Sequence, residues 1–125
     1  IFDKEVILRQ KVAKAYDEIL NKQSMIKPPT IKEENTSVYA QYTVEVNNRE
    51  EVQKFMIKNE IPTAVHYPSI LPAQKAFKEI INNQIDKFPV ALEKSKKVLS
   101  LPMHPYLEIE EQELIIKNLI QISDR

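Results

Sequence analysis

The chain has 125 residues, of which 42% are hydrophobic and 29% are charged, a balance typical of globular proteins and not of disordered ones. Its 18 Lys and Arg residues equal its 18 Asp and Glu residues, so its charge gives no reason to expect nucleic acid or an anionic membrane as a partner. It contains no cysteine and no glycine, which excludes disulfides, thiolate nucleophiles, cysteine-held metals and glycine-rich phosphate loops.

The first predicted element is a helix from about Asp3 to Asn21. Charged side chains fill one face of this helix, and we interpret them as a solvated surface. The segment from Ser24 to Asn35 contains two adjacent prolines and several charges, and is predicted to be a loop. The apolar residues that recur at helical spacing, and so predict the buried face of the helix, are Phe2, Val6, Ala13, Tyr16 and Leu20.

A strand followed by a second helix is predicted next. Val38 to Val46 alternates strictly between two kinds of side chain, which is typical of a strand covered on one face. Asn47 and Asn48 offer an N-cap for a helix over Arg49 to Lys58. Asn59 is expected to take the left-handed conformation that often ends a helix. The strand residues expected to face the core are Val38, Ala40, Tyr42, Val44 and Val46.

The segment from Ile61 to Phe77, IPTAVHYPSILPAQKAF, contains three prolines, so neither a helix nor a central strand passes through it. A short strand is predicted over Thr63 to His66, followed by a stiff loop. His66 and Tyr67 then lie where a strand ends, a common place for a side chain to meet a ligand. Judged by spacing alone, however, one His beside one Tyr is more often a packed or surface pair than a site.

The rest of the chain is predicted to be mainly helical. A short helix is expected around Ala76 to Ile81, ended by Asn82 and Asn83, with a surface loop over Gln84 to Lys87. Further expected elements are a helix from Pro89 to Lys97, a brief strand from Val98 to Leu101 and a helix from Ile109 to Ser123. Helices outnumber strands, so the predicted class is α+β.

The residues alone predict no catalytic group and no metal ligand. The only histidines are His66 and His104, and neither has a serine or a carboxylate in a recognisable relation to it. Two histidines are also too few, and too poorly spaced, to indicate a metal site.

Three segments of the chain resemble the DegT/DnrJ/StrS sugar aminotransferases, a family that uses pyridoxal phosphate (PLP). They are TAVHYP over Thr63 to Pro68, FPVALEKSKKVLSLP over Phe88 to Pro102, and LPMHPYL over Leu101 to Leu107. The opening DKEVILRQKVAKAYDEIL also resembles the helix in which that family leaves its catalytic domain. The resemblance covers nearly the whole chain, in the order that the family shows.

This resemblance implies a fold and a place in a longer protein. Residues 1–125 would form a single domain, the C-terminal small domain of a fold-type I PLP aminotransferase, with a small, mostly antiparallel sheet packed with helices. Residues 1–21 would be the helix that links it to the large domain. The intact protein would be a cytoplasmic homodimer that transfers an amino group, typically from glutamate, to a keto-sugar carried on a nucleotide.

The resemblance also implies where the cofactor is held. In the family, the Schiff-base lysine and the residues that hold PLP lie in the preceding large domain, and no lysine here lies in the family's lysine motif. PLP is therefore expected in the intact enzyme, while this segment alone should be inactive. No run of apolar residues approaches the ~20 that a transmembrane helix needs, and the charges balance, so neither a membrane nor nucleic acid is an expected partner.

His66 and Tyr67 match the pair that contacts the sugar-nucleotide substrate in relatives, and they are the expected substrate-binding residues. Imidazole and phenol suit such ligands because each exchanges hydrogen bonds and offers an apolar face. The chain departs from the family after Ser69, where a second proline and a later histidine are lost, and at Leu92, where the usual acid is displaced to Glu93. No site is expected at either place, and His104 is expected to be a turn residue.

Two alternatives stay open beside the aminotransferase interpretation. The chain could be a non-catalytic sugar-nucleotide-binding or regulatory module of the same fold, or a structural interaction domain without a small ligand. A lysine motif in the preceding sequence would favour the aminotransferase, and binding of a sugar nucleotide would separate the two alternatives from each other.

Overall fold

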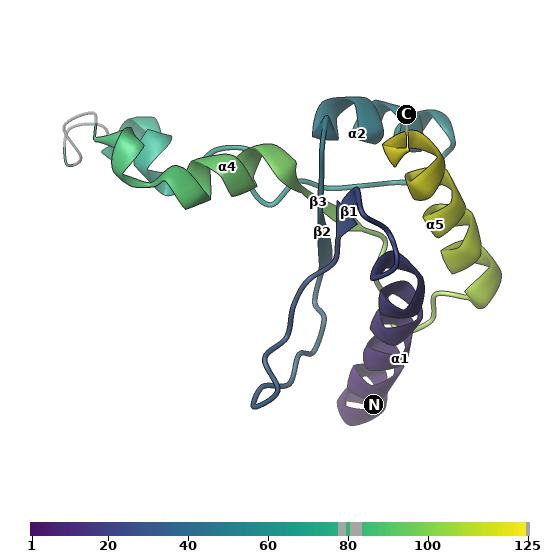
Figure 1. Cartoon of the computed structure of the whole chain (residues 1–125). Coiled ribbons are helices and arrows are strands. Elements are labelled where there is room, and N and C mark those ends of the chain that lie inside the picture. The colour runs from purple at the N-terminus through teal and green to yellow at the C-terminus, as the bar shows by residue number, and fades with distance from the viewer. Residues whose placement is uncertain (78–79, 81–83, 125) are drawn as a thin grey trace.

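A three-stranded antiparallel sheet, in the order β1-β2-β3, lies at the centre of the fold (Figure 1). The computed structural model describes residues 1–77, 80 and 84–124. The strands are β1 (Ile26–Lys27), β2 (Tyr42–Val46) and β3 (Val98–Leu101), and the α-helices in the described ranges are α1 (Phe2–Leu20), α2 (Arg49–Lys58), α4 (Pro89–Lys97) and α5 (Ile109–Ser123). The predicted α+β class, with a small antiparallel sheet and helices, is confirmed.

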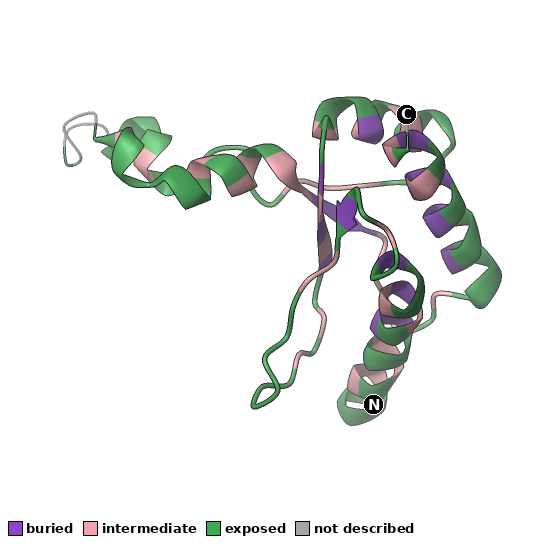
Figure 2. Cartoon of the chain, in the orientation of Figure 1, coloured by how far each residue is buried: buried purple, intermediate pink, exposed green. Residues whose placement is uncertain are grey.

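The hydrophobic core lies between one face of the sheet and the helices α1, α2 and α5 (Figure 2). Tyr42, Val44 and Val46 of β2 are buried, as the alternation in the sequence predicts. Thr43 and Glu45 are half-buried on the opposite face. Full burial of each apolar side chain stabilises the fold by about 1.5–3 kcal/mol, so this face holds the helices on the sheet.

Helices α1 and α5 pack against each other and share polar contacts as well as apolar ones. The side-chain amide of buried Gln112 donates to the backbone carbonyl of Val12 (3.0 Å). Glu108 and Glu111 form a reciprocal capping box that begins α5. The predicted bounds of α2, α4, β3 and α5 are confirmed, and those of α1 differ by one residue at each end.

The predicted strand from Val38 to Val46 is too long. The ladder begins only at Tyr42, because Tyr39 has a positive φ of 45° and turns the chain out of strand geometry. The Arg9 guanidinium donates to the backbone carbonyl of Tyr39 (3.2 Å) and fixes this turn against α1. Val38 consequently lies outside the core, with 51% of its surface exposed.

Two further local predictions are wrong. The left-handed residue after α2 is Glu60 (φ 61°) and not Asn59, whose side-chain amide instead donates to the Phe55 carbonyl (2.8 Å). The expected strand over Thr63 to His66 is reduced to a single antiparallel bridge between Ala64 and Ser100, since the flanking prolines limit further pairing. Asn48 is the N-cap of α2 as predicted, in a left-handed conformation (φ 49°).

The described part of residues 66–97, here called the arm (66–77, 80 and 84–97), extends away from the sheet and is largely exposed (Figures 1 and 2). Of the predicted helix around Ala76 to Ile81, Ala76 and Phe77 lie instead in a 3-10 turn, Lys75–Phe77, which follows another at Leu71–Ala73, whereas Ile80 is helical as predicted. Its other positions, and its predicted end at Asn82 and Asn83, lie outside the described residues. The predicted loop over Gln84 to Lys87 contains a further 3-10 turn, Ile85–Lys87.

The base of the arm is attached to the sheet and to α2 by polar contacts. Nζ of Lys94 lies 2.6 Å from both carboxylate oxygens of Glu45 on β2. The guanidinium of Arg49, at the start of α2, donates to the backbone carbonyl of Ser95. Of the arm residues that the structure describes, only Ile70 is buried, so the base of the arm meets the sheet and α2 through polar contacts more than through an apolar core.

Candidate functional site

His66 and Tyr67 lie where the chain leaves the edge of β3 and enters the arm. Two residues before His66, the backbone of Ala64 is paired with that of Ser100. The Ala64 N–H donates to the Ser100 carbonyl (3.1 Å), and the Ser100 N–H donates to the Ala64 carbonyl (2.7 Å). Both predicted site residues therefore start from a backbone position fixed by the sheet.

The imidazole of His66 belongs to a row of polar side chains across the sheet. Its Nδ1 lies 3.2 Å from the Ser100 hydroxyl, which lies 2.9 Å from the hydroxyl of Thr43. Thr43 and Ser100 are direct partners of β2 and β3, and Ser100 is only 5% exposed. Side chains alternate along a strand, so this row lies on the face opposite the apolar core. Nε2 of His66 has no hydrogen-bond partner among the described residues.

Tyr67 stands beside His66 with its ring free of the core. The two ring centroids are 5.6 Å apart and the planes meet at 89°, an edge-to-face arrangement. The peptide bond between the two residues is cis, and Tyr67 is 70% exposed. The structure thus brings the two predicted site residues together, with two polar groups available at one place on the surface.

A hollow of about 250 Å³ adjoins His66. It is lined by residues 40–41, 62–64, 66 and 100–103, so three separate segments of the chain meet there. Sequence reasoning missed Ser100 and Thr43 as neighbours of His66. Alternation along VLSL places Ser100 on the face opposite Leu99 and Leu101, but the register that pairs it with Thr43 is not readable from the sequence.

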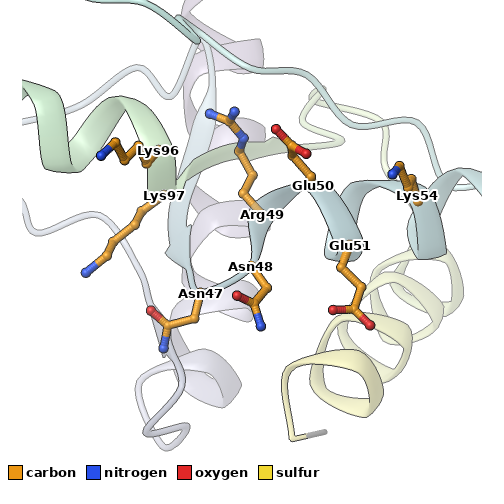
Figure 3. A pocket seen from close by; sticks show the side chains of 8 residues that line it. All are labelled: Asn47, Asn48, Arg49, Glu50, Glu51, Lys54, Lys96 and Lys97. Carbon is orange, nitrogen blue, oxygen red and sulfur yellow. The ribbon is translucent and has the colours of Figure 1, made fainter.

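A larger, open hollow of about 840 Å³ lies between the start of α2 and the end of α4 (Figure 3). Neither His66 nor Tyr67 lines it, and its cationic side chains are accompanied by two carboxylates. Two of its charged side chains already have partners: Arg49 holds the base of the arm, and Lys97 pairs with Glu93 (2.7 Å). The lining residues are Asn47, Asn48, Arg49, Glu50, Glu51, Lys54, Lys96 and Lys97.

The remaining positions considered in the sequence take part in surface contacts. His104 is exposed in a turn, as predicted, and its Nδ1 accepts a hydrogen bond from the backbone N–H of Tyr106 (3.3 Å). Glu93 lies one helical turn before Lys97, and its hydrogen bond with Lys97 lowers the pKa of the Glu93 carboxyl. The Tyr106 hydroxyl donates to Glu5 (2.7 Å), and this contact raises the pKa of the Tyr106 phenol.

The described part of the chain offers no set of residues that fits PLP. Such a site needs a lysine in an enclosed cleft together with groups for the phosphate and the ring nitrogen. The three lysines that line the large hollow, Lys54, Lys96 and Lys97, lie at its open surface, and Lys97 is paired with a carboxylate. Within the same described ranges, no group of three His, Asp or Glu side chains is placed to hold a metal ion.

A comparison of the sequence with models of known protein families shows to which family the chain belongs. The model of the DegT/DnrJ/EryC1/StrS aminotransferase family matches residues 2–120. The chain belongs to this family. The resemblance noted in TAVHYP and the two later segments is thereby confirmed.

The chain is similar to members of the family over most of its own length. It is 47% identical over 115 residues to the UDP-2-acetamido-2-deoxy-3-oxo-D-glucuronate aminotransferase of Pseudomonas aeruginosa, covering 92% of this chain and 31% of that protein. It is 30% identical over 115 residues to the pleiotropic regulatory protein of Geobacillus stearothermophilus, covering 90% of this chain and 31% of that one. This DegT/DnrJ/EryC1/StrS chain thus spans about a third of the curated relatives it matches.

Solved structures show the same arrangement of elements. The PMP form of a Streptococcus pneumoniae protein described as a sugar aminotransferase superposes with a TM-score of 0.83 at 26% identity. The match covers 95% of this chain and 31% of that one. No described helix of our chain is both long and apolar enough to cross a bilayer.

Proposed function

We propose that this chain is the C-terminal small domain of a PLP-dependent nucleotide-sugar aminotransferase, and that α1 is its link to the large domain. The observation that carries the proposal is the His66–Tyr67 pair: two exposed polar rings, fixed to the edge of the sheet and beside a hollow. Family membership and the match to about a third of each relative support it.

In this proposal, His66 and Tyr67 bind the sugar part of the substrate. Nε2 of the imidazole would donate to or accept from a sugar hydroxyl, and the phenol would do the same from the adjoining position. The two ring faces would pack against the apolar side of the sugar. The relative with 47% identity is named for UDP-2-acetamido-2-deoxy-3-oxo-D-glucuronate, so a UDP-linked 3-keto-sugar acid is the first substrate to test.

The cofactor and the amino donor belong to the intact protein in this proposal. PLP supplies the chemistry of amino transfer, and the residues that hold it would lie in the large domain. A structural neighbour in the PMP form supports this, as PMP is the amino form of PLP. The proposal includes the homodimer, the cytoplasmic location and the glutamate donor that the family implies.

The first experiment is the visible absorption spectrum of the intact protein before and after addition of glutamate. A PLP absorption band that disappears with glutamate supports a working aminotransferase. A colourless protein that takes up no added PLP would exclude it. That result would favour a non-catalytic module, an alternative to which the name of the Geobacillus relative, a pleiotropic regulatory protein, gives some support.

The second experiment tests the site. His66→Ala and Tyr67→Phe in the intact enzyme should each raise the KM for the nucleotide sugar while PLP stays bound, with a loss of about five-fold in kcat/KM for each hydrogen bond removed. The matched control is His104→Ala, which removes an exposed turn histidine. Wild-type kinetics in both site variants would disprove the assignment of His66 and Tyr67.

A further inference from the structure

We propose that Ser100 is a positioning residue for His66, and that Thr43 supports it from the neighbouring strand. The inference rests on the proposed function, because it assigns how the sugar-binding imidazole is held. Its basis is the row of three side chains in which Ser100 lies between the other two, at 3.2 Å from Nδ1 of His66 and 2.9 Å from the Thr43 hydroxyl.

Ser100 is suited to this role because the sheet holds its backbone in place and its side chain is buried. It is 5% exposed, it lies in β3 opposite Thr43, and its backbone N–H and carbonyl are both bonded to Ala64. His66, in contrast, is an exposed side chain at the start of the arm. A fixed hydroxyl against Nδ1 therefore removes rotational freedom from a ring that would otherwise have to be ordered when the substrate binds.

The row of hydroxyls can bond Nδ1 of His66 whichever of the two ring nitrogens carries the proton. If Ser100 donates to Nδ1, Thr43 can donate to Ser100, and Nε2 then carries the proton and acts as a donor. If Nδ1 carries the proton, Ser100 accepts from it and donates to Thr43. In both cases Nδ1 is occupied, and Nε2, which has no partner in the described ranges, is left to bond the ligand.

The test uses the intact PLP-loaded enzyme and measures its two half-reactions separately, with glutamate and with UDP-2-acetamido-2-deoxy-3-oxo-D-glucuronate. Ser100→Ala should lower kcat/KM for the sugar about five-fold, as expected for one hydrogen bond, and leave the glutamate half-reaction unchanged. Thr43→Val should act in the same direction by a smaller factor. Ser95→Ala is the matched control, since its hydroxyl donates only to the nearby Leu92 carbonyl.

A double-mutant cycle with His66→Ala separates positioning from general damage. If Ser100 acts through His66, Ser100→Ala should cost nothing further in the His66→Ala background. Equal losses in both backgrounds, or a parallel loss in the glutamate half-reaction, would show a merely structural role and overturn the inference. Should Ser100→Ala fold poorly, the same cycle with Thr43→Val decides the question.

The failure of this inference is distinguishable from failure of the proposed function. A His66→Ala variant with wild-type sugar kinetics overturns the site itself. A strong effect of His66→Ala together with no effect of Ser100→Ala or Thr43→Val overturns only the role of Ser100.

Discussion

The hydroxyl of Tyr42 donates a 2.5 Å hydrogen bond to Oδ1 of Asp17, joining the central strand β2 to helix α1. Tyr42 is completely buried, and the ring of Tyr16 lies 4.8 Å from its own. Burial, and then the hydrogen bond to Asp17, raise the pKa of the Tyr42 phenol. This contact fixes the helix that leads into the chain against the sheet that carries the candidate site.

Replacing Tyr42 by Phe should lower the free energy of unfolding of the 125-residue chain by about 1.5–3 kcal/mol, the usual cost of losing a hydrogen bond to a charged group. Urea denaturation measures the change. Tyr39→Phe is the matched control: its ring stacks on Tyr42 at 6.2 Å, but its hydroxyl has no hydrogen-bond partner among the described residues. Tyr39→Phe should change the free energy of unfolding by no more than about 0.5 kcal/mol. Equal losses in the two variants would contradict the role of Asp17.

The buried tyrosines also predict a fall in stability at alkaline pH. Burial raises the pKa of both Tyr16 and Tyr42 above the ordinary value of 10.0. Below pH 10 the phenols are neutral in the folded and the unfolded chain, so their stabilising effect is complete. Above pH 10 the unfolded chain loses these protons while the folded chain retains them, and unfolding becomes more favourable.

The measurement for this prediction is urea denaturation of the wild-type chain and of Tyr42→Phe between pH 9 and about pH 11. In this range the phenols of the unfolded chain ionise while the buried phenols of the folded chain stay neutral. The free energy of unfolding should decrease with rising pH less steeply in the variant, because the Tyr42 phenol no longer contributes a proton. Parallel curves would show that Tyr42 ionises equally in both states.

Helical periodicity predicted α1, α2 and α5 well because each of these helices places apolar residues on the core. Periodicity still could not predict which apolar residues of a helix are the most deeply buried. In α5, Leu114 and Leu119 are both apolar residues of the predicted helix, yet Leu114 is 54% exposed and Leu119 is fully buried. Where a helix lies on its neighbours is decided by tertiary packing, which a single sequence does not contain.

The errors at strand and helix ends come from contacts between distant residues. The strand containing Tyr42 begins late because Arg9, 30 residues earlier, holds the Tyr39 carbonyl in a turn. At the candidate site, the family motif indicated His66 and Tyr67, but Ser100 lies 34 residues from His66. Only the register of β2, β3 and the bridge at Ala64 brings that hydroxyl to the imidazole.

The contrast between the two leucines of α5 gives a direct test of the core. Leu119→Ala should lower the free energy of unfolding by about 2–5 kcal/mol, since it removes buried apolar area and leaves a cavity. Leu114→Ala makes the same chemical change on the same helix at a position that is 54% exposed, and should cost less than about 1 kcal/mol. A similar loss in both variants would mean that α5 presents a different face to the sheet.

The ion pair at the base of the arm should contribute little to stability. Nζ of Lys94 lies 2.6 Å from each carboxylate oxygen of Glu45, but the two side chains remain 38% and 24% exposed. Solvent screening and the ordering of a long side chain offset most of the attraction in such a pair. Lys94→Met should therefore lower the free energy of unfolding by less than about 1 kcal/mol. At 1 M salt the loss should shrink further, because the screening length falls to about 3 Å.

Lys117→Met is the control for that change, since Lys117 is exposed on α5 and has no side-chain partner in the described ranges. The arm also keeps its second attachment in Lys94→Met, the hydrogen bond from Arg49 to the Ser95 carbonyl. Use of the nucleotide sugar by the intact enzyme should accordingly stay within about two-fold of wild type, less than the effect of one lost hydrogen bond. A loss of sugar use as large as that in His66→Ala would instead mean that the Lys94–Glu45 pair itself holds the arm in its binding position.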